Sequence, residues 1–252
     1  MTDDQSSDIP AAPARASFGD AAARERVAVA LDLPSLEEAE ALAARLAGEV
    51  GWFKVGLELF AAHGPTAVET IRGYGPVFLD AKLHDIPTTV RRAAARIAEL
   101  DVGLLTVHAA GGAPMLRAAV EGLGERGEVL GVTVLTSMSD EDLAAVQAPP
   151  AAQQVVHLAR LAVAAGVPGL VCAPRDLAAV RAAVGADVRL VTPGIRPDGS
   201  GDDDHARAAT PGAAITAGAD LLVVGRPVTR AADPLAAASG IVKAVAAAAT
   251  PA

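Results

Sequence analysis

The sequence predicts an α/β fold, a (β/α)8 TIM barrel that forms a single domain. Three observations favour it. The chain has 252 residues, a length that one α/β barrel commonly occupies. Eight short apolar runs are separated by segments with helical spacing, which is typical of a parallel sheet with crossover helices. Polar side chains follow the apolar runs at the ends that a barrel brings together.

The eight apolar runs have the length of buried strands and carry apolar residues on both faces, as parallel strands covered by helices do. In chain order they are VAVALDL (27–33), WFKVGL (52–57), VFLDAKL (77–83), LLTVHA (104–109), VLGVTVLT (129–136), GLVCA (169–173), VRLVTPGI (188–195) and LLVVGRPV (221–228).

Six segments between these runs place apolar residues three and four positions apart, and several of them end at glycine, as helices do. They are residues 35–47, 87–100, 113–124, 152–166, 174–185 and 210–219. Periodicity alone fits a doubly wound open sheet almost as well as a barrel.

Polar residues near the ends of the runs favour the barrel. All carboxyl ends of barrel strands converge on one mouth, where such folds carry their chemistry, whereas an open sheet would spread the same residues along an edge. The residues in question are Asp32, Lys54, Asp80, Lys82, His108, Thr136, Arg196 and Arg226.

Composition narrows the class of protein further. The net charge of −9, from 21 basic and 30 acidic residues, argues against a nucleic-acid surface built on bulk positive charge. No run is long enough to span a membrane. A single cysteine, Cys172, cannot form an internal disulfide, which favours the cytosol. We expect residues 1–24 to be a flexible leader and residues 25–248 to form the barrel.

The stretch FLDAKLHDIPTTV (78–90) concentrates charge after an apolar run. Side chains two apart in a strand point to the same side, so Asp80 and Lys82 should face one space. Asp85 follows in the loop before Pro87, which suits the first turn of a helix. A structural ion pair with Asp85 as a helix cap is the simpler alternative, but buried pairs stabilise weakly. Three charges aligned with the other mouth residues favour an active site.

Several motifs together identify a family. DAKLHDIPTT resembles the D-x-K-x-x-D-I-P-x-T segment of the orotidine 5′-phosphate decarboxylase family, which catalyses the last step of UMP biosynthesis. The same family order holds for LDL with Asp32, FKVGLELF with Lys54, VHAAGG, VTVLTSM with Thr136, PGIRP with Arg196, and VVGRPVT with Gly225 and Arg226.

The resemblance implies roles for the acidic and basic residues. The family removes CO2 from carbon 6 of orotate without metal or other cofactor. Lys82 would donate the proton to that carbon, and Asp80 would lie against the departing carboxylate. Asp85 and Lys54 would complete an alternating charge network, with Lys54 also touching the ribose.

The resemblance also implies binding residues and a partner. Asp32 would bind the ribose hydroxyls, Thr136 the pyrimidine, and Ile86 is expected with them at the substrate. In the family, the residues matching Asp85 and Thr89 reach into the neighbouring subunit's site, so a homodimer would be the catalytic unit.

A phosphate site is expected on independent grounds. Barrels commonly bind phosphate on the loops after strands seven and eight, where Arg196 and Arg226 fall. A guanidinium offers phosphate a planar bidentate fork, and Gly225 allows a backbone N–H to approach closely.

One position departs from the family pattern. Bacterial members usually carry a glutamine, in D-Q-K-R, that bridges phosphate and pyrimidine. Here the loop reads DDDHARAATP, so His205 stands in its place. A histidine can still donate a hydrogen bond, so we expect altered affinity rather than lost activity. The surrounding segment PDGSGDDD could form a lid over phosphate or a plain surface loop.

Two other functions fit parts of the pattern. A metal-dependent sugar-phosphate decarboxylase or synthase of the same barrel group would share D-x-K-x-x-D and use its carboxylates for Mg²⁺. DIPTT and PGIR favour the pyrimidine enzyme instead. A non-catalytic nucleotide-phosphate binding barrel would not need Asp80, Lys82 and Asp85 together.

Overall fold

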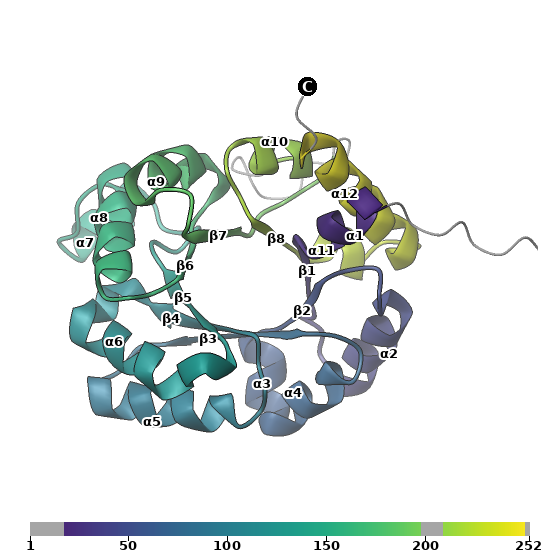
Figure 1. Cartoon of the computed structure of the whole chain (residues 1–252), viewed down its shortest axis with the longest axis horizontal. Coiled ribbons are helices and arrows are strands. Elements are labelled where there is room, and N and C mark those ends of the chain that lie inside the picture. Colours follow the sequence, from purple (N-terminus) through teal and green to yellow (C-terminus); the bar gives the residue numbers. More distant parts are fainter. Residues whose placement is uncertain (1–17, 198–208, 250–252) are drawn as a thin grey trace, which may run out of the picture.

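The computed structural model describes residues 18–197 and 209–249 of the chain. Its eight parallel strands form a closed barrel in chain order, with the helices arranged around the outside (Figure 1). The strands are β1 (Val27–Ala30), β2 (Trp52–Val55), β3 (Val77–Leu83), β4 (Leu104–His108), β5 (Glu128–Val132), β6 (Gly169–Val171), β7 (Arg189–Thr192) and β8 (Leu221–Val224). Pairing of β1 with β8 closes the ring, so the predicted (β/α)8 barrel is confirmed and the open sheet is excluded.

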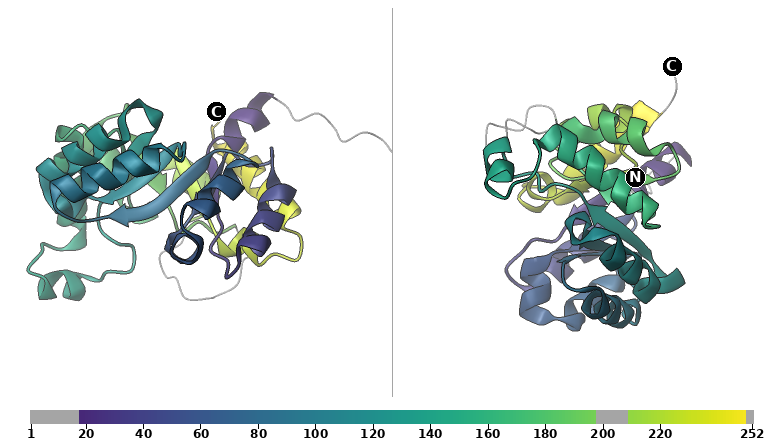
Figure 2. Two further views of the ribbon diagram at one scale, coloured as in Figure 1. Left: turned by 90° about the horizontal axis from the view of Figure 1, so that it is seen from below. Right: turned by 90° about the vertical axis from the view of Figure 1, so that its left-hand side faces the viewer.

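Helices follow the strands as the crossover rule requires. They are α1 (Phe18–Arg24), α2 (Leu36–Leu46), α3 (Leu57–His63), α4 (Pro65–Arg72), α5 (Pro87–Ala98), α6 (Gly112–Leu123), α7 (Asp140–Ala145), α8 (Ala151–Ala164), α9 (Leu177–Val184), α10 (Pro211–Thr216), α11 (Arg226–Thr229) and α12 (Pro234–Ala249). Figure 2 shows the segment that carries α7 extending away from the body of the barrel.

Several helices lie outside the six predicted segments. Helix α12 is mostly alanine and other apolar residues, with Ser239 and Lys243 as its polar side chains, so its sequence has little contrast between an apolar and a polar face. Helices α3 and α4 meet at Gly64, whose φ of 58° breaks the helical path between them. Short helices of this kind have too few turns for a period to be read.

The N-terminal boundary also differs from the prediction. Helix α1 occupies residues that were assigned to the leader, and Ala23 is 2% exposed in the main core. Two turns of helix carry too little periodicity to reveal themselves. Residues 1–17 lie outside the described part of the chain.

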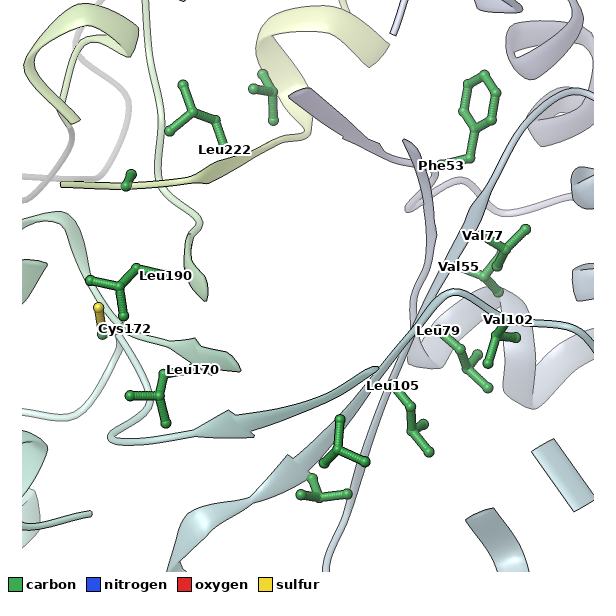
Figure 3. Close-up of a cluster of buried hydrophobic side chains, with 14 of the residues drawn as sticks. Phe53, Val55, Val77, Leu79, Val102, Leu105, Leu170, Cys172, Leu190 and Leu222 are labelled. Carbon is green, nitrogen blue, oxygen red and sulfur yellow. The ribbon is translucent and has the colours of Figure 1, made fainter. Parts of the chain in front are cut away.

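The apolar side chains form two layers on either side of the strand ring. The outer layer packs between strands and helices and includes Phe53, Leu79, Leu105 and Leu190, which point away from the ring (Figure 3). A smaller cluster fills the barrel interior and includes Phe78, Leu104 and Leu221. Because strand side chains alternate between these layers, the register of each strand decides which residue reaches the mouth.

Candidate active site

The residues that face the barrel interior change from apolar to polar along each of the first four strands. Phe78 belongs to the interior cluster, and Asp80, two residues later on β3, lines the cavity at the mouth. The same step of two leads from Leu104 to Thr106 on β4, and from Ala30 to Asp32 after β1. The period of two that predicted a shared face therefore also places the charges on top of the apolar interior.

Four charged side chains form a continuous alternating row at this mouth. Asp32 Oδ1 lies 3.1 Å from Lys54 Nζ, which lies 3.4 Å from Asp80 Oδ2. Lys82 Nζ donates to both oxygens of Asp80 at 2.8 Å. The predicted neighbours Asp32, Lys54, Asp80 and Lys82 are thus brought together from three strands.

The Asp80 carboxylate is held ionised by its neighbours. Burial alone would raise the pKa of Asp80, but the charges of Lys54 and Lys82 and hydrogen bonds from Lys82 and Thr106 lower it below its ordinary value. Asp80 therefore carries a negative charge at neutral pH, and Lys54, only 7% exposed, is buried beside it.

A cavity of about 570 Å³ opens above this row. The four charged residues line this cavity together with Thr136, Gly194, Val223 and Gly225. An adjoining lobe of about 250 Å³ continues from Thr136 and Gly225 to Arg196 and Arg226. A small-molecule ligand commonly occupies a cavity of this size, and here one end would meet the charge row and the other the two arginines.

Three predicted site residues lie outside this cavity. Asp85 and Ile86, just before α5, and Thr89, in its first turn, are exposed, and none of them lines either lobe. Asp85 Oδ1 accepts the N–H of Ile86 at 2.6 Å, and Ile86 itself is 67% exposed. Asp85 forms no ion pair with any residue in the described part of the chain, so within one chain the predicted acid–base–acid trio is reduced to Asp80 and Lys82.

Comparison with known proteins identifies the relatives of this barrel. A family model described as "Orotidine 5'-phosphate decarboxylase / HUMPS family" matches residues 25–241. The chain belongs to this family.

Relatives within the family are similar over most of the chain. An orotidine 5′-phosphate decarboxylase of Anaeromyxobacter dehalogenans (strain 2CP-1 / ATCC BAA-258) is 57% identical over 219 residues, which cover 86% of this chain and 96% of the relative. One of Thermobifida fusca (strain YX) is 55% identical over 218 residues, 85% of this chain and 93% of the relative. The crystal structure of the Lactobacillus acidophilus orotidine 5′-phosphate decarboxylase superposes with a TM-score of 0.78 at 37% identity, covering 87% of this chain and 98% of that one.

Some predicted residues of the family site end up in loops rather than strands. Strand β5 stops at Val132, so Thr136 lies in the loop that follows it instead of within the predicted run 129–136. Arg226 likewise begins α11 rather than ending β8. At the mouth of a barrel the backbone leaves the strand ladder to line the cavity, although the apolar pattern continues.

His205, at the position of the family's glutamine, and the candidate lid around it lie outside the described residues. The predicted effect of His205 on affinity stays a prediction.

Two residues of the site were not predicted from the sequence. Thr106 contacts both Asp80 and Lys82. Gly56 leaves room for the Asp32–Lys54 ion pair, because a Cβ there would overlap Asp32 Oδ1 and come within 3.0 Å of Lys54 Nζ. The spacing along the sequence could have indicated both residues. Gly56 lies two positions after Lys54, and Thr106 lies two positions before His108, so each is expected on the same side as a predicted site residue.

Two features are absent from the described part of the chain. Among residues 18–197 and 209–249, no group of three or more His, Cys, Asp or Glu side chains is arranged to hold a metal ion. In the same part of the chain, no helix has the length and apolar character needed to cross a membrane.

Proposed function

We propose that this chain converts orotidine 5′-phosphate to UMP and CO2, with Lys82 as the proton donor. The chain is an enzyme of the carboxy-lyase class, as its family membership and its relatives at 55% and 57% identity show. The observation that carries the mechanistic part is the contact of Lys82 Nζ with both oxygens of Asp80, at 2.8 Å, on the wall of the cavity.

In the proposed reaction the bond between carbon 6 and the carboxylate breaks, and its electron pair stays on carbon 6. That pair lies in the plane of the ring, out of reach of the ring's π system, so the protein must stabilise the charge directly. The ammonium of Lys82 offsets this charge and then transfers a proton to carbon 6, which gives UMP. Solvent reprotonates the Lys82 amine after the product leaves.

Asp80 would act on the same step from the other side of the reacting carbon. With the substrate bound, its ionised carboxylate faces the substrate carboxylate. Two like charges ~4 Å apart at an effective dielectric near 20 repel by about 4 kcal/mol. This repulsion disappears as CO2 forms, so it disfavours the bound substrate relative to the transition state.

The remaining predicted residues would bind the rest of the nucleotide. Asp32 and Lys54 lie at the position proposed for the ribose hydroxyls, and Thr136 borders both lobes, where the pyrimidine would lie. Arg196, Gly225 and Arg226 surround the smaller lobe, whose place on the loops after β7 and β8 suits the phosphate.

The proposed activity is tested by the loss of orotate absorbance from orotidine 5′-phosphate, with and without excess chelator. We expect decarboxylation at the same rate in both, because amine and carboxylate groups carry the chemistry. Loss of activity in chelator, restored by Mg²⁺, would instead support the metal-dependent sugar-phosphate type of enzyme.

The catalytic unit is proposed to be a homodimer in which Asp85 and Thr89 reach the neighbouring subunit's cavity. The support is their exposure just before α5 and in its first turn, near the exposed apolar side chain of Ile86 in the sequence. We also place the enzyme in the cytosol, a proposal that rests on the single cysteine.

Mixing two inactive variants tests the shared site. One preparation carries Lys82→Ala and the other Asp85→Asn. If Asp85 acts across the interface, each mixed dimer regains one intact site, so random exchange restores about a quarter of wild-type activity. If Asp85 acts within its own chain, every site in the mixture stays defective and no activity returns.

A further inference from the structure

Thr106 occupies an unusual position between the two reacting groups of the proposed mechanism. It lies on β4 and is only 1% exposed. Its hydroxyl donates to Asp80 Oδ1 at 2.9 Å. The hydroxyl oxygen, Thr106 Oγ1, also accepts a hydrogen bond from the backbone N–H of Lys82 at 2.9 Å. One buried hydroxyl thus contacts both members of the Asp80–Lys82 pair.

The backbone around Lys82 needs such a support. Strands β3 and β4 pair regularly at Leu79 and Leu105, and then resume at Leu83 and Val107. The β3 strand therefore covers four residue steps where β4 covers two, which is a bulge. Within it Lys82 has a φ of 47°, a left-handed conformation that a residue with a Cβ rarely adopts unless its surroundings hold it there.

The contacts of Thr106 explain how the bulge is held. In a regular strand the N–H of Lys82 would face the ladder, but here it donates to the Thr106 hydroxyl. The O–H that remains is directed at Asp80 Oδ1, which leaves Asp80 Oδ2 facing Lys54 at 3.4 Å. The Thr106 hydroxyl thus donates one hydrogen bond, to Asp80, and accepts one, from the Lys82 backbone, so both of these bonds act on the same charge pair.

We propose that Thr106 is a positioning residue that holds the Asp80 carboxylate and the bulged Lys82 backbone in their reactive arrangement. This inference rests on the proposed function of Lys82 and Asp80, and extends it to a residue that touches neither substrate nor cavity. Small displacements of reacting groups lower the rate of the chemical step more than they lower substrate affinity.

Substitution of Thr106 by valine, which keeps the shape and removes the hydroxyl, is the main test. Thr106→Val should lower kcat about 10- to 100-fold, the usual effect of losing a hydrogen bond to a charged group. KM should change by less than about threefold because the cavity lining is unchanged. Thr106→Ser keeps the hydroxyl and should retain kcat within about threefold of wild type.

A matched control uses Thr192, a fully buried threonine of β7 whose hydroxyl donates to the Cys172 carbonyl at 2.9 Å. Thr192→Val removes an equally buried hydroxyl away from the charge row, and should keep kcat within about twofold. If Thr106→Val does not fold, Thr106→Ala provides the same measurement with more space at the site.

A second readout requires no turnover. A hydrogen bond to a carboxylate lowers its pKa, so the pKa of Asp80, followed by carbon NMR, should rise in Thr106→Val and not in Thr106→Ser. The other groups facing Asp80 are Lys54, Lys82 and His108, and all of them remain in both variants.

These readouts separate the inference from the proposed function. Wild-type enzyme that fails to decarboxylate orotidine 5′-phosphate overturns the function, and the NMR titration then decides the role of Thr106. Thr106→Val or Thr106→Ala with wild-type kcat and an unchanged Asp80 titration overturns the inference. So does a loss in Thr192→Val as large as that in the Thr106 variants.

Discussion

The two sides of the barrel mouth hold their polar groups in different ways. On the side of β1 to β4, Asp32, Lys54, Asp80 and Lys82 contact one another directly, and Lys54 is only 7% exposed. On the side of β7 and β8, the residues that line the smaller lobe include several glycines and prolines, and Arg226 among them is exposed. The first side is organised before any substrate arrives, whereas the second holds one exposed arginine, Arg226, and one half-buried arginine, Arg196.

This difference indicates separate roles for the two sides, one in the chemical step and the other in substrate binding. Preorganised charges lower the energy of a transition state because they need no rearrangement as charge develops. Guanidinium groups just beyond the strand ends suit the capture of a phosphate, and their binding energy can support the reaction at a distance. We therefore expect substitutions on the two sides to separate into effects on kcat and effects on KM.

Lys82→Ala should give the largest effect. Without the ammonium, neither charge stabilisation nor proton transfer is available, and kcat should fall by at least about 10⁴-fold. Steady-state kinetics on orotidine 5′-phosphate measure this loss. Lys243→Ala, which removes an exposed lysine of α12, is the control and should leave kcat unchanged; equal losses in both variants would contradict the assignment.

Arg226→Ala and Arg196→Ala sharpen the comparison from the other side. Each removes a charge-assisted contact proposed for phosphate, so KM should rise by about 10- to 100-fold, with a smaller change in kcat. Arg160→Ala on the exposed face of α8 is the matched substitution and should change neither constant. A loss confined to kcat in the mouth variants would break the proposed division.

Gly56→Ala probes the spacing within the charge row. The added Cβ would overlap Asp32 Oδ1, so the ion pair must shift, and kcat should fall by about tenfold. Gly240→Ala, at a position in α12 with open space around it, should instead stabilise the fold by roughly 0.5–1 kcal/mol. Equal kcat in wild type and Gly56→Ala would show that the row tolerates displacement.

His108, at the end of β4, gives the smallest expected effect. Burial, followed by the charges of His84 and Lys82, lowers its pKa below 6.5. The unfolded chain then binds a proton more readily than the folded one, so the free energy of unfolding should decrease as pH falls below 6.5, down to the folded-state pKa. Urea titrations between pH 5 and 8 measure this slope, and it should be shallower in His108→Gln; identical slopes would remove His108 as its source.

The sequence was sufficient for the fold and the family because both depend on patterns along the chain. Eight apolar runs with polar ends predicted the barrel, and the order of DAKLHDIPTT, PGIR and VGRP predicted the family. Alternation within β3 predicted that Asp80 and Lys82 share one side, and their side chains are in contact, although the backbone that brings them together is a bulge and not a regular strand.

What the sequence could not predict depends on contacts between strands. Thr106 contacts both Asp80 and Lys82 because β3 bulges against β4. The two-residue alternation of apolar and polar side chains does not indicate where a strand bulges. The room that Gly56 leaves for Asp32 depends in the same way on the register of β1 and β2. Asp85 and Thr89 line neither lobe of the cavity in their own chain, as far as the structure describes it. Their proposed role in substrate binding therefore requires a second subunit.

In the proposed mechanism the ammonium of Lys82 carries the chemistry and is not needed to bind the nucleotide. The most direct test is the affinity of the Lys82→Ala variant for UMP, measured by calorimetry on the preparation used for kinetics. We expect a dissociation constant within about tenfold of that of wild type, together with a turnover reduced by at least about 10⁴-fold. A loss of UMP affinity as large as the loss of turnover, or turnover close to that of wild type, would contradict it.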